Sequence, residues 1–238
     1  PYTTLFRSGV LASVLAVAAS SAMAASSVDI HVTGKIVPSS CTPAFISGGG
    51  IADFGTMKVA SLNSTTPTPL ADVKIIPISI TCEEATRVGV TFNDSHVDSA
   101  PTENMPVNFI DSDFITSAGF TAGLGMYGDK KIGAYSMGIQ KTDGATTNGD
   151  GVNLYPIFTS DNGASWGVKS GFRYLQVKPD KSEIYSFTDQ ATGTVAPVAQ
   201  TKINFNVGIA AMINPTNDLN ITDEATLDGL TNVELVYL

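Results

Sequence analysis

The sequence predicts an all-β fold, and three observations support that prediction. Charged residues make up only 15% of the 238 residues. Gly, Ser, Thr and Asn are abundant, and Val and Ile recur in short runs, which is typical of extracellular β proteins. Short apolar alternations with a period of two recur between Gly- and Pro-containing turns, and long amphipathic helical patterns are absent. β-sandwiches of this length are often single domains.

The beginning of the chain has the pattern of a processing segment. Residues 1–8 resemble a translated sequencing-adapter tail, so we exclude them from fold reasoning. Residues 9–24 form an apolar run, too short to span a bilayer, that ends in Ala22-Met23-Ala24, an A-x-A cleavage signal. We expect an exported protein in which residues 1–24 are removed, 25–40 form an N-terminal extension and 41–238 form the folded domain.

The extension contains an apolar alternation directly after the predicted cleavage site. Its members share one face of an extended strand: Val28, Ile30, Val32, Gly34 and Ile36. A strand with one apolar side needs a sheet to join. The alternation alone leaves two alternatives open: the first edge strand of an ordinary sandwich, or a strand that joins the sheet of another molecule.

Cys41 and Cys82 are the only cysteines of the chain. An even pair in an exported chain predicts an intradomain disulfide. Closing that loop stabilises the fold by about 4 kcal/mol in the chain-entropy model. The sequence has no C-x-x-C pattern that would indicate redox chemistry or zinc.

The first half of the domain has a recognisable order of elements. A turn at residues 47–50 precedes a predicted short strand at residues 51–55, with Ile51 and Phe54 directed toward the core. Residues 63–69 form a proline-stiffened loop. Strands follow at residues 73–81, where Pro77 indicates an edge or a bulge, and at residues 87–92.

This order, together with the run Val-x-Ile-x-Val-x-Gly-Lys-Ile-Val-x-x-x-Cys, resembles the chaperone-usher fimbrial subunits, or pilins. The resemblance covers residues 28–92 and implies an immunoglobulin-like sandwich. It also implies that residues 28–37 complete the sandwich of a neighbouring subunit by strand addition. Partners implied are a periplasmic chaperone, an outer-membrane usher and neighbouring fimbrial subunits.

The middle, residues 93–200, is longer and richer in loops than a compact pilin, and resembles an uncharacterised family of larger fimbria-associated proteins. Residues 119–137 predict two strands joined through Gly128-Asp129. A second hairpin is predicted at residues 159–168. Residues 142–151 contain three glycines and no apolar anchor, so we expect a mobile tip.

The end of the chain returns to sandwich strands. Residues 201–209 alternate apolar and polar side chains, and a final strand contains Val233, Leu235 and Tyr237. The alternation before Tyr237 resembles the segment by which the periplasmic chaperone holds pilins. The alternative is a plain final core strand.

Residues 159–166 match the Asp-box pattern [ST]-x-D-x-G-x-[ST]-W, which is known from sialidases and other propellers. Physically the pattern describes a turn. Asp161 accepts backbone N–H groups, Gly163 takes a positive φ, and Trp166 packs beneath. One copy is too few for a propeller, so we interpret the box as a structural turn. An exposed Trp166 would instead indicate carbohydrate stacking.

Catalytic or metal chemistry has little support in the sequence. The only histidines are His31 and His96, and Asp94, His96 and Asp98 lie in a single loop without a second contributing segment. We therefore expect no enzyme activity, cofactor or metal. The net charge of −9 disfavours nucleic acid as a partner.

Taken together, the sequence predicts a pilin-type sandwich with enlarged middle loops and hairpins. The function it favours is a structural or tip-associated subunit of a chaperone-usher fimbria that contributes to surface adhesion. Such a protein passes through the periplasm and ends at the cell surface. The alternatives are a secreted carbohydrate-binding adhesin that binds a host glycan and, third, a glycan-cleaving enzyme built around the Asp-box.

Overall fold

The computed structural model describes residues 28–36, 39–105, 117–168 and 173–238. The chain divides into two compact units, Pro1–Val37 and Pro38–Leu238. The predicted leader and the cleavage site before Ala25 lie outside the described residues. No helix in the described part of the chain has the length and apolar character needed to cross a membrane.

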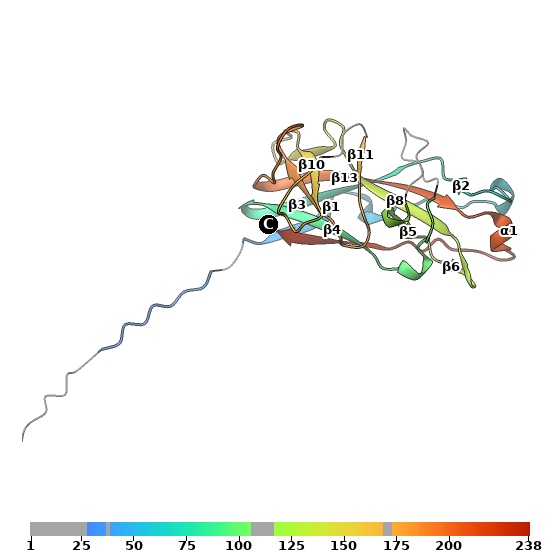
Figure 1. The fold of residues 1–238 in the computed structure, drawn as a ribbon, viewed down its shortest axis with the longest axis horizontal. Helices are drawn as coiled ribbons and strands as arrows, with labels where there is room; N and C mark the ends of the chain where they lie inside the picture. The colour runs from blue at the N-terminus through green and yellow to red at the C-terminus, as the bar shows by residue number, and fades with distance from the viewer. Residues whose placement is uncertain (1–27, 37–38, 106–116, 169–172) are drawn as a thin grey trace, which may run out of the picture. The chain divides into compact units, whose positions relative to one another are not determined.

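The second unit contains two antiparallel sheets, which confirms the predicted all-β sandwich (Figure 1). The first sheet has the order β1-β3-β13-β8-β11, and three short strands extend it. Its strands are β1 (Cys41–Phe45), β2 (Thr68–Pro69), β3 (Lys74–Thr86), β5 (Thr121–Gly123), β8 (Gly133–Gln140), β9 (Thr146–Asn148), β11 (Tyr174–Gln176) and β13 (Gln200–Ile213).

The second sheet has the order β10-β12-β4-β14. Its strands are β10 (Tyr155–Thr159), β12 (Ile184–Thr188), β4 (Val88–Asp94) and β14 (Thr231–Tyr237). A separate hairpin joins β6 (Met126–Tyr127) to β7 (Lys130–Lys131). The helical turns are α1 (Thr216–Leu219) and the 3-10 turns η1 (Gly48–Gly50), η2 (Val59–Ser61), η3 (Val97–Ser99) and η4 (Ala118–Phe120).

The core lies between the two sheets. Phe187 of β12 and Phe205 of β13 are both fully buried, and their ring centroids lie 5.0 Å apart. Along β13 the predicted alternation is confirmed, because Ile203, Phe205 and Val207 are buried while the residues between them are half-buried. The hydrophobic effect on this alternating face holds the two sheets together.

Two of the strands predicted for the first half of the domain are present. The predicted strands at residues 73–81 and 87–92 correspond to β3 and β4. Pro77 lies one residue beyond the ladder between β1 and β3, which ends at Phe45 and Ile78. There the Ile46 N–H donates to the Pro77 carbonyl at 2.9 Å, and proline has no N–H to return the second bond, so the ladder with β1 ends at this position.

The middle contains one confirmed and one wrong prediction. Gly128 and Asp129 do form the turn between β6 and β7. The predicted mobile tip at residues 142–151 is wrong, because it contains β9, which pairs with β13. Ala145 and Thr146 are buried there, and the Thr146 hydroxyl donates to the Gln140 carbonyl. Pairing with a long central strand outweighed the local glycine content.

Candidate functional site

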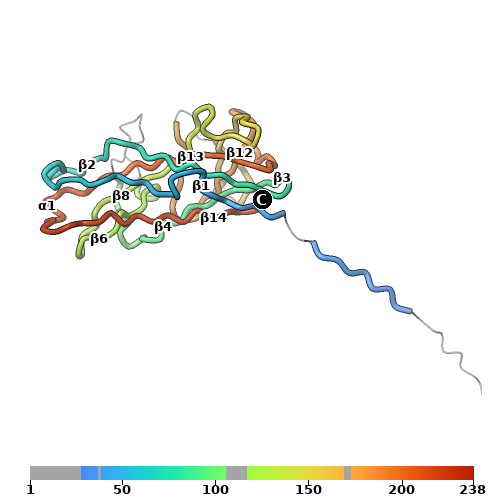
Figure 2. The backbone as a smooth tube through the Cα atoms, turned by 180° about the vertical axis from the view of Figure 1, so that it is seen from behind, coloured from blue at the N-terminus to red at the C-terminus, as the bar shows by residue number. Residues whose placement is uncertain are grey.

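A groove lies where the two sheets are open on the same side. β1 is the edge of the first sheet and β14 is the edge of the second. From the Cys41 end toward α1, the chain after β1 and the chain before β14 run side by side in both views (Figure 2). Between them is a groove of about 960 Å³ with a mainly apolar lining.

The first rim of the groove is formed by residues 51–57. The predicted strand at residues 51–55 is wrong, because these residues belong to no sheet. The Asp53 carboxylate accepts the Gly55 N–H at 2.7 Å, and this local turn bond replaces a ladder. Phe54 packs against the core, as predicted, whereas Ile51 is 72% exposed and lines the groove instead.

The second rim is formed by residues 221–230, which run from α1 toward β14. Ile221 and Leu227 pack against the core and line the groove. The Tyr127 hydroxyl accepts the Thr222 N–H at 3.1 Å, which fixes the start of this rim. The pKa of the Tyr127 phenol is lowered by hydrogen bonds with the Thr222 hydroxyl and the Thr222 N–H, followed by one with the Asp223 N–H.

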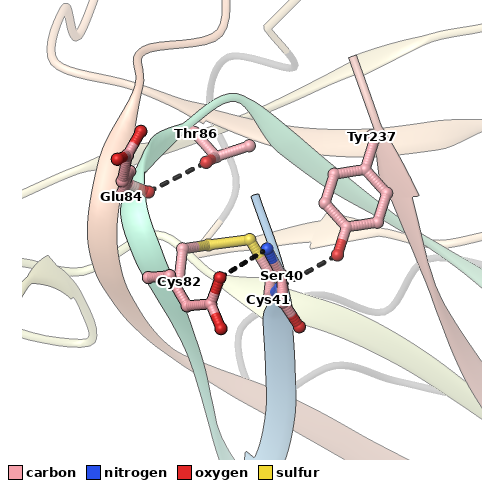
Figure 3. Close-up of a disulfide and its surroundings, with 7 residues drawn as sticks. Ser40, Cys41, Cys82, Glu84, Thr86 and Tyr237 are labelled. Carbon is pink, nitrogen blue, oxygen red and sulfur yellow. Dashed lines mark hydrogen bonds between the residues drawn. A yellow bond between two sulfur atoms is a disulfide. The ribbon is translucent and has the colours of Figure 1, made fainter. Parts of the chain in front are cut away.

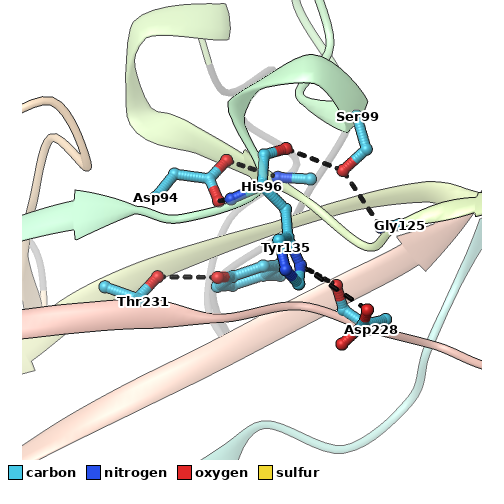
Figure 4. A network of polar contacts seen from close by, with 8 residues as sticks. Asp94, His96, Ser99, Gly125, Tyr135, Asp228 and Thr231 are labelled. Carbon is cyan, nitrogen blue, oxygen red and sulfur yellow. Dashed lines mark hydrogen bonds and ion pairs between the residues drawn. The ribbon is translucent and has the colours of Figure 1, made fainter.

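The end of the second rim rests on Tyr135. A Cβ added to Gly229 would lie 2.7 Å from the Tyr135 ring, so only glycine allows the chain to pass so closely. The Tyr135 hydroxyl and the Thr231 hydroxyl lie 2.6 Å apart (Figure 4). Burial raises the pKa of Tyr135 to about 12, so the groove floor carries a neutral phenol at physiological pH.

The floor is arranged in rows across the first sheet. A row consists of a residue of β13 and the residues that lie opposite it in β3, in β8 or in both. Five such rows follow one another, each two residues from the next along β13. Each row contributes at least one residue that lines the groove. From the Cys41 end toward α1 these are Ile78; Ile76 and Val207; Ile209 and Met137; Tyr135; and Ile213.

At the Cys41 end, beyond the residues that line the groove, two links join segments distant in sequence. The predicted disulfide between Cys41 and Cys82 is present and joins β1 to β3. The Cys41 N–H also donates to the Tyr237 hydroxyl at 2.9 Å, which ties the edge of one sheet to the edge of the other (Figure 3). β14 confirms the predicted final strand, with Val233 and Leu235 half-buried and Tyr237 45% exposed.

Residues 28–36 have no regular secondary structure and belong to neither sheet. The first strand of the sandwich is β1. The apolar side chains of the segment, Val28, Ile30, Val32 and Ile36, are between 87% and 103% exposed. No atom beyond its chain neighbours lies within 4 Å of a Cβ added to Gly34. Val37 lies outside the described residues.

The Asp-box forms the predicted turn. Asp161 accepts the Ser165 N–H at 2.9 Å, and Gly163 has a φ of +89°. Hydrogen bonds from the Ser165 and Thr159 hydroxyls, and then from the Ser165 N–H, lower the pKa of Asp161 to about 2. Trp166 is half-buried beside Gly163, and Phe158 and Gly167 exchange two backbone bonds that close the hairpin.

The residues considered for metal binding have other roles. The two oxygens of the Asp94 carboxylate accept backbone N–H groups from His96 and Gly123. The His96 ring faces the Asp228 carbonyl, 2.6 Å from Nδ1. Within the described ranges, no group of three His, Cys, Asp or Glu side chains is arranged to hold a metal ion.

Sequence reasoning missed Tyr135, His96, Asp228 and Thr231 as residues of one site. Tyr135 is one member of a buried strand, and Asp228 lies in a loop with no motif. Only the topology brings these residues together. Tyr135 comes from β8, His96 from the turn after β4, Asp228 from the chain before β14, and Thr231 is the first residue of β14. No local sequence signal predicts such a meeting.

Fold and site together define a two-sheet antiparallel sandwich with an apolar groove between two sheet edges. A family model described as "Protein of unknown function (DUF1120)" matches residues 30–136, from within the exposed segment to β8. Protein GltF of Escherichia coli (strain K12) is 28% identical, over 94% of this chain and 94% of that protein. Uncharacterized protein YhcF of the same organism is 29% identical, over 92% of this chain and 94% of that protein.

Proposed function

We propose that this protein is a subunit of a chaperone-usher fimbria that accepts an extended strand in its groove and donates residues 28–37 to a neighbour. The observation that carries the proposal is the groove itself. It is about 960 Å³ in volume, apolar, and bordered by one edge of each sheet. An edge with unpaired backbone groups beside apolar pockets is what strand addition requires.

The exposed segment has the complementary pattern. Four apolar side chains on one face are exposed in this chain, and burying each contributes about 1.5 to 3 kcal/mol. The sum of roughly 6 to 12 kcal/mol is the apolar contribution before the cost of ordering the segment, and main-chain hydrogen bonds to the sheet edge add to it. A structural, non-catalytic role needs no cofactor.

The rows of the floor favour one direction and one register. β14 runs from Thr231, beside Tyr135, to Tyr237 at the Cys41 end. A strand that pairs with β14 in the antiparallel sense therefore runs from the first row toward the fifth. The five inward positions of the donated segment, from Val28 to Ile36, then match the five rows in order. Gly34 falls at the row of Tyr135, which has the bulkiest side chain of these rows.

The same edge supports a chaperone partner during export. Val233, Leu235 and Tyr237 present alternating side chains along the free edge of β14. Without a partner, this edge and the groove expose apolar surface that promotes aggregation. The proposal therefore includes a periplasmic chaperone, an outer-membrane usher and neighbouring subunits, with the cell surface as the final location.

No described contact favours the alternatives. The Asp161 carboxylate binds within its own turn, which is a structural use of the Asp-box. Trp166 packs beside Gly163. Sugar binding and glycan cleavage therefore remain without a supporting observation.

Deletion of residues 25–35 tests the donor role. With the chaperone co-expressed, we expect the truncated protein to fold and bind the chaperone but not to enter fibres, because its sandwich is intact and only its donated strand is missing. Fibre incorporation is measured by shearing fibres from cells and immunoblotting. Normal incorporation, or unfolding despite the chaperone, would refute the donor role.

Gly34→Leu and Val28→Leu form a matched pair for the register. Val28 is 89% exposed, and no described atom beyond the chain neighbours lies within 4 Å of a Cβ added to Gly34, so both variants should fold normally. Gly34→Leu should reduce fibre incorporation strongly because of the clash at Tyr135, whereas Val28→Leu should be tolerated at the first row. Equal effects of the two variants would exclude this register.

The chaperone contact is tested by Tyr237→Ala combined with Leu235→Ser. We expect co-purification with the chaperone to be lost, because two of the three edge side chains are removed. Circular dichroism of the refolded variant checks that the sheets form. Unchanged co-purification of a folded variant would remove β14 from the assembly argument.

A further inference from the structure

The turn that follows β4 is fixed from one side by a buried carboxylate. Asp94 is only 8% exposed, and its two oxygens accept the His96 N–H at 2.8 Å and the Gly123 N–H at 3.0 Å. The Ser99 hydroxyl donates to the His96 carbonyl and accepts the Gly125 N–H (Figure 4). The turn therefore has a defined position relative to the chain at and after β5.

From this turn, two bonds reach the second rim of the groove. The Ser95 N–H donates to the Leu230 carbonyl at 2.8 Å. The His96 Nδ1 lies 2.6 Å from the Asp228 carbonyl oxygen, and because a carbonyl only accepts, Nδ1 carries the proton. Asp228 is flanked by groove-lining residues, Leu227 on one side and Gly229 and Leu230 on the other.

We propose that His96 is a positioning residue for the groove, and that its ring N–H holds residues 227–230 in the course that keeps the second rim in place. The hydrogen bonds of the two sheets do not involve this ring. Its loss therefore frees the rim without removing a sheet bond. The importance of the rim for assembly depends on the strand-accepting function proposed above, whereas the clamp itself does not.

Hydrogen exchange of the full-length chain tests the clamp. In His96→Ala, the Asp228 N–H, which donates to the Leu124 carbonyl, should exchange about five- to tenfold faster, the effect of one lost hydrogen bond. The amides of β12 serve as the reference and should be unchanged. His96→Asn places an amide donor where Nδ1 lies and should restore slow exchange, whereas His96→Gln moves the donor outward and should not.

Four results would overturn the proposal: unchanged exchange in His96→Ala, equal acceleration of the β12 amides, no restoration by His96→Asn, or restoration by His96→Gln. Because no strand binding is measured, failure here is distinct from failure of the fibre assays.

Discussion

The two sides of the sandwich differ in how their apolar surface is covered. On the closed side, β12 and β13 bury Phe187 and Phe205 completely against each other, and the Ser186 hydroxyl donates to the Val88 carbonyl. On the open side, the groove is bordered by residues 51–57 and 221–230, which lie in no ladder and are only half-buried or exposed. The chain completes its own core on the first side, and we propose that another molecule covers the second.

The difference has an energetic meaning. Apolar area left open to water contributes nothing to the stability of this chain, but it is available to a partner. Side chains of the same kind should therefore have different effects on the two sides. Substitutions on the closed side test the free energy of unfolding, and substitutions on the open side test association.

The largest effect is expected for Phe205→Ala. Phe205 is fully buried, and truncation of such a ring costs about 3 to 5 kcal/mol of unfolding free energy. Phe54→Ala is the matched change on the open side, where the ring is half-buried, and should cost about 1 kcal/mol. Urea unfolding of the two variants measures both values. Equal losses would mean that the groove rim is as much a part of the core as β13.

The disulfide should have a similar but somewhat smaller effect. Replacing Cys41 and Cys82 together by Ser opens a loop with a sequence separation of 41 residues, which costs about 4 kcal/mol in the chain-entropy model. The loss is measured by urea unfolding of the oxidised wild type and the double variant. The wild type under reducing conditions is the control. A loss below about 1 kcal/mol would show that β1 is held by its ladder with β3 alone.

Tyr237→Phe tests the link between the two sheet edges. The variant removes the acceptor of the Cys41 N–H, and we expect a loss of about 1 kcal/mol together with faster exchange of that amide. Tyr155→Phe is the control, since the Tyr155 hydroxyl has no hydrogen-bond partner among the described residues. Equal unfolding free energies and equal exchange of the Cys41 amide in the two variants would mean that the Tyr237 hydroxyl does not link the two sheet edges.

The sequence predicted the parts of the fold that depend on alternation, and failed where tertiary pairing or turn chemistry decided. β13, β4 and β14 have an apolar side chain at every second position, and in β4 these side chains, Val88, Val90 and Phe92, lie in the core. Residues 51–55 show an apolar pattern as well, but they form no ladder, and the Asp53 carboxylate accepts the Gly55 N–H in a local turn. Residues 142–151 show no apolar pattern, yet β9 forms because β13 offers it a partner.

The candidate site was predictable only in part, for the same reason. The exposed segment and the last strand were visible as alternating patterns, and the disulfide followed from cysteine parity. The groove was not visible, because its floor is composed of ordinary core residues such as Ile76 and Ile209. They form a site because no strand of the described residues covers them between β1 and β14. The sequence of these residues is the same as that of a covered core, so it does not predict the groove.

The smallest effect is expected at the Asp-box turn, which lies on β10 at the edge of the second sheet opposite β14. Trp166 is the only tryptophan of the chain, so its fluorescence reports on this turn alone. The pKa of Asp161 is lowered from 3.8 to about 2, so the carboxylate stabilises the turn above about pH 4, and this contribution is lost as the pH falls through about 2. Trp166 emission should therefore stay constant down to about pH 3 and change below it. Asp161→Asn should remove that change while leaving the urea midpoint of global unfolding unchanged. Far-UV circular dichroism over the same pH range separates a local change from acid unfolding of the sheets. If the emission of Asp161→Asn follows the same pH curve as the wild type, the turn does not depend on the Asp161 carboxylate.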